Sequence, residues 1–102
     1  MASDNPDAPV RDNPAQHRYE MAIGDQIGLI AYRRAGDTID LTHTAVPEEL
    51  EGRGIAARLA RFALDDAAAR GLRVIPRCPY VAIYIRRHPE YQRLVTPQPD
   101  PQ

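Results

Sequence analysis

The sequence has 102 residues, of which 43% are hydrophobic, and a formal net charge of -1. This length gives room for one domain with a modest core. A net charge close to zero gives no electrostatic reason for binding to nucleic acid or to an anionic membrane, so we expect neither as a partner.

The single cysteine and the lack of targeting patterns bear on the cellular compartment in which the protein is expected. Cys78 is the single cysteine, and it cannot form an intramolecular disulfide. Neither a signal peptide pattern nor a run of about 18 apolar residues is present. We therefore expect a cytoplasmic protein, and we expect it to need no metal.

Both ends of the sequence are rich in proline and in polar residues. Residues 1–16 and residues 96–102 each contain three prolines and little that is apolar. Such segments cannot bury enough apolar surface to offset the entropy lost on ordering. We predict two flexible tails over these ranges and a single folded domain over residues 17–95.

The first part of this domain is predicted to form three strands. In the first, Tyr19, Met21 and Ile23 alternate with other residues, which is the period of a half-buried strand. The second is apolar on both faces, as a central strand is. Turns with glycine separate the strands, so we predict an antiparallel meander of residues 17–23, 26–33 and 38–44.

A helix and a further strand follow. Residues 55–70 are apolar over most of a helical circumference, which predicts a helix that is covered on more than one side. Gly71 is a natural C-terminal stop. Residues 72–76 then form a short strand, which a right-handed crossover would place parallel to residues 38–44.

Pro79 can open a second helix, which we expect to run to about Arg87 and to end at His88 and Pro89. The predicted order is β-β-β-α-β-α. The predicted fold class is α/β (α+β), a mixed sheet with helices packed on it.

A loop with two glycines joins the third strand to the first helix. Gly52 and Gly54 flank Arg53, so backbone N–H groups are uncovered beside the positive end of the helix dipole. This arrangement is typical of a phosphate site. The loop has neither the Lys-Ser/Thr pair of a P-loop nor the length of a dinucleotide fingerprint, which indicates a different diphosphate ligand. The alternative is an ordinary turn that uses glycine for its conformational freedom.

These residues resemble the Gcn5-related N-acetyltransferases. The pyrophosphate loop of that family reads Arg/Gln-x-x-Gly-x-Gly/Ala after a strand with Val-x-Pro or a close variant, and here residues 51–56 fill the loop, with Val46 at the expected distance. One departure is Glu51, where the family has Arg or Gln. The resemblance covers residues 19–95. Within the family, the sequence resembles a small single-domain branch in four motifs: His43-Thr44-x-Val46-Pro47, Gly52-x-Gly54-Ile55-Ala56, Pro76-x-Cys78-Pro79-Tyr80 and His88-Pro89-x-Tyr91.

The resemblance implies a minimal acyl-CoA N-acyltransferase fold, with acetyl-CoA as co-substrate and an amine as acceptor. It implies that the two parallel strands separate at a bulge near Ala45 and Val46, which leaves a slot for the pantetheine arm. An open acceptor side would admit a large acceptor such as a protein side chain. The residues expected to bind the cofactor are Ala45, Val46, Gly52, Arg53, Gly54, Ile55 and Ala56. A non-catalytic acyl-CoA-binding or interaction module is the alternative, and Glu51 favours it.

Three residues are candidates for catalysis. Tyr84 aligns with the tyrosine that protonates the departing CoA thiolate in many relatives. Its alternative role is packing of the helix together with Tyr80. Cys78 lies just before the N-terminus of a predicted helix and next to Arg77. This position favours a thiolate, which could accept the acetyl group. The alternative is that Cys78 is a small buried apolar residue, as a lone cysteine commonly is. His43 is predicted to lie on the same face as Ile39 and Leu41. It could act there as a general base, or it could be a hydrogen-bonded histidine of the core.

Overall fold

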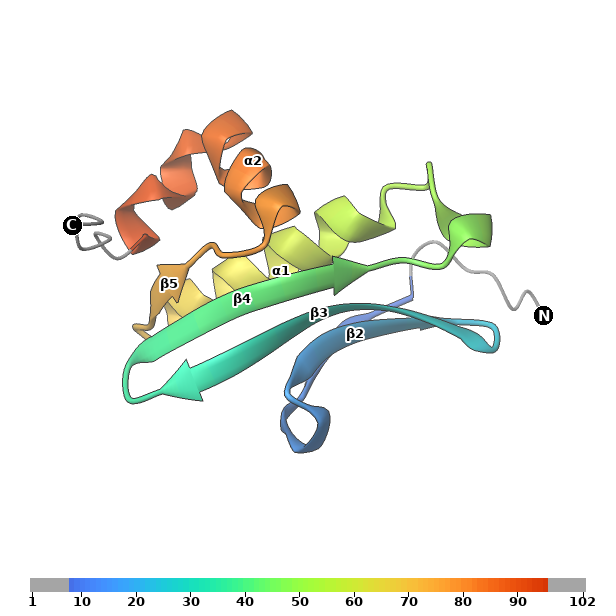
Figure 1. Ribbon diagram of the computed structural model, residues 1–102, viewed down its shortest axis with the longest axis horizontal. Coiled ribbons are helices and arrows are strands. Elements are labelled where there is room, and N and C mark those ends of the chain that lie inside the picture. Colours follow the sequence, from blue (N-terminus) through green and yellow to red (C-terminus); the bar gives the residue numbers. More distant parts are fainter. Residues whose placement is uncertain (1–7, 96–102) are drawn as a thin grey trace.

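A five-stranded mixed sheet forms the base of the fold, and two helices pack against it (Figure 1). The computed structural model describes residues 8–95. The strands lie in the order β1 (Val10–Asn13), β2 (Arg18–Ile23), β3 (Gln26–Ala35), β4 (Thr38–Ala45) and β5 (Arg73–Ile75). The helices are α1 (Ile55–Ala69) and α2 (Pro79–Arg87), with short 3-10 turns η1 (Pro14–Gln16), η2 (Glu48–Leu50) and η3 (Pro89–Leu94).

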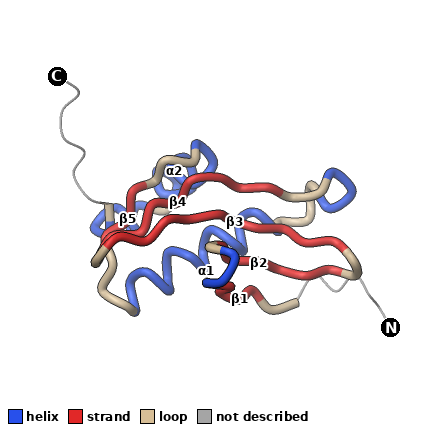
Figure 2. The backbone as a smooth tube through the Cα atoms, turned by 60° about the horizontal axis from the view of Figure 1, so that its bottom comes forward, coloured by secondary structure: helices blue, strands red, loops and turns tan. Residues whose placement is uncertain are grey.

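The strand directions agree with the sequence. Strands β1 to β4 pair antiparallel in sequence order, and β5 pairs parallel with β4 after the crossover through α1. Figure 2 shows the five strands side by side. The predicted mixed α/β architecture, including the meander of β2, β3 and β4 and the parallel return of β5, is therefore confirmed.

The core lies between the sheet and α1. Leu59, Ala63 and Leu64 of α1 are fully buried, as are Ile30 and Leu41 of the sheet. The start of α1 comes especially close to β3: a Cβ added at Gly28 would lie 3.0 Å from Cγ2 of Ile55. A side chain at position 28 would push the helix away, so this glycine fixes where the N-terminus of α1 sits.

The opposite face of the sheet is open in the described part of the chain. Ala22, Ile27 and Arg33 point to this face by the alternation of the strands, and all three are exposed. Helix α2 and η3 instead pack beside α1, where Tyr91 of η3 donates a hydrogen bond to Asp65 of α1 over 2.7 Å. Among the described residues, no helix is both long and apolar enough to cross a membrane.

The prediction of a flexible N-terminal tail is wrong for residues 8–16. Val10–Asn13 form the edge strand β1, and Ala8 is buried in the core. Side chains hold this strand: the hydroxyl of Tyr32 donates to Asp12 over 2.6 Å, and Arg70 contacts the same carboxylate at 3.2 Å. Burial, and then the bond to Asp12, raise the pKa of Tyr32 to about 12. The predictions for residues 1–7 and 96–102 lie outside the described residues.

The bulge of β4 lies earlier than expected. The register with β3 shifts between Ala31 and Tyr32, which leaves Thr42 as an extra residue in β4 rather than a residue near Val46. The hydroxyl of Thr42 donates to the carbonyl of Ala31 over 3.2 Å and fills the gap in the ladder. Because a bulge reverses the alternation, His43 turns to the open face, and Thr44 takes the face that Leu41 occupies.

Candidate functional site

Strands β4 and β5 separate soon after they begin to pair. Their ladder covers only Thr38–Asp40 of β4. The N–H of Cys78 then donates to the carbonyl of Leu41 over 2.8 Å, and no described strand pairs with the rest of β4 on that side. The expected separation is therefore present, and its closed end lies at Leu41 and Cys78.

The loop before α1 leaves backbone donors uncovered. Gly52 and Gly54 have φ values of 85° and 76°, and a Cβ added at either one would meet nothing within 4 Å. Gly54 is the N-cap of α1 and provides no side-chain cap, so the first intrahelical bond is from Arg58 N–H to the Gly54 carbonyl, at 3.1 Å. The N–H groups of residues 55–57 thus have no acceptor within the helix. We call these amides, together with Gly52 and Gly54, the phosphate cradle.

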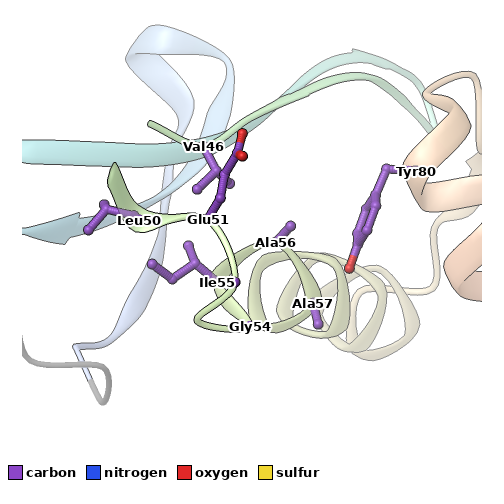
Figure 3. Close-up of a pocket in the computed structure, with 9 residues that line it drawn as sticks. Val46, Leu50, Glu51, Gly54, Ile55, Ala56, Ala57 and Tyr80 are labelled. Atoms are coloured by element: carbon purple, nitrogen blue, oxygen red, sulfur yellow. The ribbon is translucent and has the colours of Figure 1, made fainter. Parts of the chain in front are cut away.

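A pocket with a volume of about 220 Å³ connects the phosphate cradle to Val46, the residue after β4, and to α2 (Figure 3). Val46 forms one wall, and the ring of Tyr80 forms the opposite wall with its hydroxyl directed toward α1 near Ala57. Ligand pockets usually measure about 300 to 1,000 Å³, so this one can enclose only part of a molecule as large as CoA. The donors, the open space before the glycines and the apolar wall fit a diphosphate with an attached chain.

The structure brings together most of the residues predicted to bind the cofactor. Five of the seven line this pocket: Val46, Gly52, Gly54, Ile55 and Ala56. Ala45 and Arg53 are not among the lining residues, and Arg53 is exposed.

Sequence reasoning did not assign Leu50, Ala57 or Tyr80 to the site. Tyr80 was detectable in principle, because it lies one helical turn before Tyr84 on the same helix.

Glu51 also lines the pocket, and it is exposed. In Figure 3 its carboxylate points away from the first turn of α1. A negative charge at this wall opposes binding of a phosphate, but a side chain that points away from the cradle opposes it less.

Cys78 lies at the closed end of the split and is almost fully buried, with 4% of its surface exposed. It is the N-cap of α2, as the sequence predicted, and its Sγ lies 3.2 Å from Oγ1 of Thr44. Arg77 is directed elsewhere, since its Nε donates to Asp40 over 2.9 Å. The neighbour of the thiol is therefore a hydroxyl, and the charge of Arg77 is matched by a carboxylate.

Tyr84 does not line the pocket. Its ring stacks on His88 with centroids 4.0 Å apart and planes at 16°, while Nδ1 of His88 lies 2.9 Å from the Tyr84 carbonyl. Burial raises the pKa of Tyr84, and it also raises the pKa of Tyr80, where nearby Arg87 acts in the opposite direction. Both phenols are therefore protonated at neutral pH.

His43 is exposed, so the prediction that it shares a face with Ile39 and Leu41 is wrong. The bulge at Thr42 is the physical reason. Among the described residues, no group of three or more His, Cys, Asp or Glu side chains is arranged to hold a metal ion.

Comparison with known proteins defines the family. The family model described as GCN5-related N-acetyl-transferase matches residues 18–94, which is most of the chain. The chain therefore belongs to the GCN5-related N-acetyltransferase family. The structure also resembles the NMR solution structure of a GCN5-like protein from Staphylococcus aureus, with a TM-score of 0.69, coverage of 100% of this chain and 97% of that chain, and 18% sequence identity. That likeness confirms the fold.

Vertebrate relatives are similar in sequence. Protein NATD1 of Xenopus tropicalis is 40% identical over 72 residues, which cover 70% of this chain and 66% of that protein. Protein NATD1 of Homo sapiens is 39% identical over 72 residues, which cover 70% of this chain and 64% of that protein. The match thus spans slightly less than two thirds of the length of these relatives.

Proposed function

We propose that the protein transfers an acetyl group from acetyl-CoA to an amine. The observation that supports this most is the phosphate cradle, whose uncovered amides lie in a pocket walled by Val46, which follows β4, and by Tyr80 of α2. Few ligands combine a diphosphate with a long flexible arm, and membership of the family favours CoA among them.

The residues of the site suggest how CoA would be held. The N–H groups of Ile55, Ala56 and Ala57 and the positive end of α1 would bind the diphosphate. Val46 and Tyr80 would contact the arm, and the unpaired edge of β4 offers it backbone hydrogen bonds. Bound acetyl-CoA supplies an acetyl group activated as a thioester.

Direct transfer needs little from the protein beyond position and charge stabilisation. The amine nitrogen forms a bond to the carbonyl carbon, the C–S bond breaks, and the electron pair goes to sulfur. A backbone N–H near Val46 would stabilise the negative oxygen that develops on the carbonyl. The nitrogen then loses one proton to water, and a tyrosine or water would return a proton to the thiolate, so that the products are the amide and the CoA thiol.

An acetyl-enzyme route through Cys78 is the alternative chemistry. The thiolate would take the acetyl group from CoA and pass it to the amine. Burial of Cys78 and its hydroxyl neighbour Thr44 favour direct transfer instead. Incubation with acetyl-CoA alone distinguishes the two routes: an acetyl mass increment that Cys78→Ser abolishes and that chases into product would establish the covalent route.

A non-catalytic acyl-CoA-binding module is the second candidate function, and Glu51 in the pocket wall favours it. Calorimetry with CoA and turnover of acetyl-CoA with a panel of amines separate the candidates. Binding with turnover supports the transferase, and binding without turnover supports the module. If millimolar CoA gives no heat of binding, both are wrong.

A further inference from the structure

A second hollow, with a volume of about 500 Å³, lies on the sheet away from the phosphate cradle. It forms where β3 runs past the start of β2, beside the turn η1 (Figure 1). We call it the basic hollow, and its lining residues are Gln16, His17, Ala31, Tyr32, Arg33, Arg34 and Thr42. No acidic residue among those described lines it, so the charged groups of its lining are all positive.

The two arginines of the basic hollow are not paired with carboxylates of residues 8–95, in contrast to several other arginines of the chain. Arg18, Arg70 and Arg77 each contact a carboxylate at 2.7 to 3.2 Å. Arg33 and Arg34 form no ion pair with any described residue, and Arg34 reaches only the carbonyl of Gly36, at 3.4 Å. Asp40 lies opposite Arg33 in the ladder, but its carboxylate bonds to Arg77, so both arginines can meet an anionic partner.

The backbone beside them is also open. The ladder between β2 and β3 ends at Ala31, and the N–H of Tyr32 then donates to the carbonyl of His17 over 2.9 Å. On that side, residues 33–35 of β3 have no strand partner in the described chain. Such an edge can pair with an extended peptide that adds a strand.

The position of the basic hollow relates it to the site. Thr42, which lines the hollow, follows Leu41, whose carbonyl marks the closed end of the split. A chain bound in the hollow would therefore reach β4 one residue from the closed end of the split.

We propose that the basic hollow binds an extended acidic peptide segment, so that the acceptor is a protein amine with acidic residues near it in sequence. This assignment of the acceptor class rests on the proposed function, but the binding itself does not. Arg33 and Arg34 are successive residues of β3 and point to opposite faces, and successive carboxylates of an added strand would alternate in the same way to meet them while its backbone pairs with the free edge of β3. This segment would not contact the phosphate cradle or the pocket beside it.

Binding of labelled peptides, followed by fluorescence anisotropy with the full chain, tests the proposal. Three peptides of equal length carry one lysine flanked by Glu, by Gln or by Lys. We expect the Glu peptide to bind about tenfold more tightly than the Gln peptide, which corresponds to two partly exposed ion pairs. The preference should shrink as ionic strength rises above about 0.1 M, because salt screens exposed charges.

Two double variants locate the effect. Arg33→Glu with Arg34→Glu should abolish the preference for the Glu peptide, whereas Arg33→Lys with Arg34→Lys should keep most of it. Arg86→Glu with Arg93→Glu changes the net charge equally at exposed positions of α2 and η3, and it should keep the preference.

Each other outcome overturns the proposal. Equal binding of the Glu and Gln peptides would mean that the arginines only protect the strand edge from pairing. Equal loss in both charge-reversed variants would mean a net-charge effect. Acetylation of a small neutral amine, measured separately, reports on the proposed function alone, so the two proposals fail independently.

Discussion

Gly54 is needed for its backbone conformation, and this gives a sharp test of the phosphate cradle. Its φ of 76° is left-handed, and a Cβ there meets no other atom within 4 Å. Gly54→Val should therefore cost roughly 1 to 2 kcal/mol of stability, the strain of a left-handed side-chain residue. It should also weaken CoA binding strongly, because a Cβ would stand in the space before the first-turn amides. Calorimetry with CoA measures the affinity.

Gly36 provides the matched control. It has a φ of 58° in the turn between β3 and β4, and a Cβ added there also meets nothing within 4 Å. Gly36→Val should cost similar stability and leave CoA affinity unchanged. If both variants lose affinity alike, strain rather than the cradle explains the loss.

The two tyrosines of α2 can be separated by removing one oxygen from each. Tyr80 lies in the pocket, whereas Tyr84 stacks on His88 outside it. If a tyrosine protonates the CoA thiolate, Tyr80→Phe should lower kcat by about 10²-fold with little change in KM, at the lower end of what a positioned acid contributes. Tyr84→Phe should lose much less. A larger loss for Tyr84→Phe would instead favour the residue chosen by alignment with the family.

His43 shows the limit of reading single residues from a pattern. Alternation along β4 correctly predicted that Ile39 and Leu41 are buried. It failed for His43 because Thr42 inserts an extra residue, held by a hydrogen bond to Ala31 of another strand. A bulge depends on the partner strand, so the period of one strand does not contain it.

At the level of elements, β1 shows why the proline-rich, polar composition of residues 1–16 wrongly predicted a flexible tail there. Two prolines flank the strand, which a sheet edge tolerates because one side of an edge strand needs no ladder bonds. Side chains from other elements supply its stability: Glu20 of β2 binds Arg11 at 2.7 Å and Asn13 at 3.2 Å. The other strands and α1 carry enough apolar residues to be predicted from local pattern, and α2 was predicted from the prolines at its start and after its end.

Glu20 is the residue through which this attachment can be tested. Its side chain is 5% exposed, and it accepts hydrogen bonds from Arg11, Asn13 and Arg18. Glu20→Gln should cost about 1 to 2 kcal/mol at pH 7, since charge-assisted bonds become neutral ones and Arg11 is largely exposed. Urea unfolding measures the difference. Glu90→Gln, at an exposed position, should change stability by less than about 0.5 kcal/mol.

The same variant predicts a dependence on pH. The bond from Arg18, followed by those from Asn13 and Arg11, lowers the pKa of Glu20 below its ordinary value of 4.5, although burial acts against them. The stabilisation is therefore present above pH 4.5 and is lost as the pH falls through the lowered pKa. The difference between the wild type and Glu20→Gln should shrink over that acid range. A difference that stays constant down to pH 2 would contradict the ionic origin, because about 2 is below the usual range of carboxyl pKa values.

In the whole molecule, the site is assembled from segments that are distant in sequence. The end of β4, the start of α1 and the first turn of α2 meet around one pocket. The glycine loop carried a local signal and was predictable. The sequence marked Tyr80 only as a neighbour of Tyr84 on the same helix face, and which of the two tyrosines enters the pocket depends on how far β4 and β5 separate and on how α2 packs beside α1.

This assembly predicts where a bound ligand would protect the backbone. CoA in the pocket should slow amide hydrogen exchange in residues 52–57 and in the first turn of α2, because it contacts both and holds the split in one arrangement. At about 100 times its Kd, it should also stabilise the protein by about 2.7 kcal/mol. The turn between β3 and β4 is part of neither wall, and its exchange should change only by this global stabilisation. Mass-resolved exchange with and without CoA, repeated on Gly54→Val at the same ligand concentration, tests the prediction. Protection centred on Ala31 and Thr42 would place CoA on the open face of the sheet and would contradict the cradle.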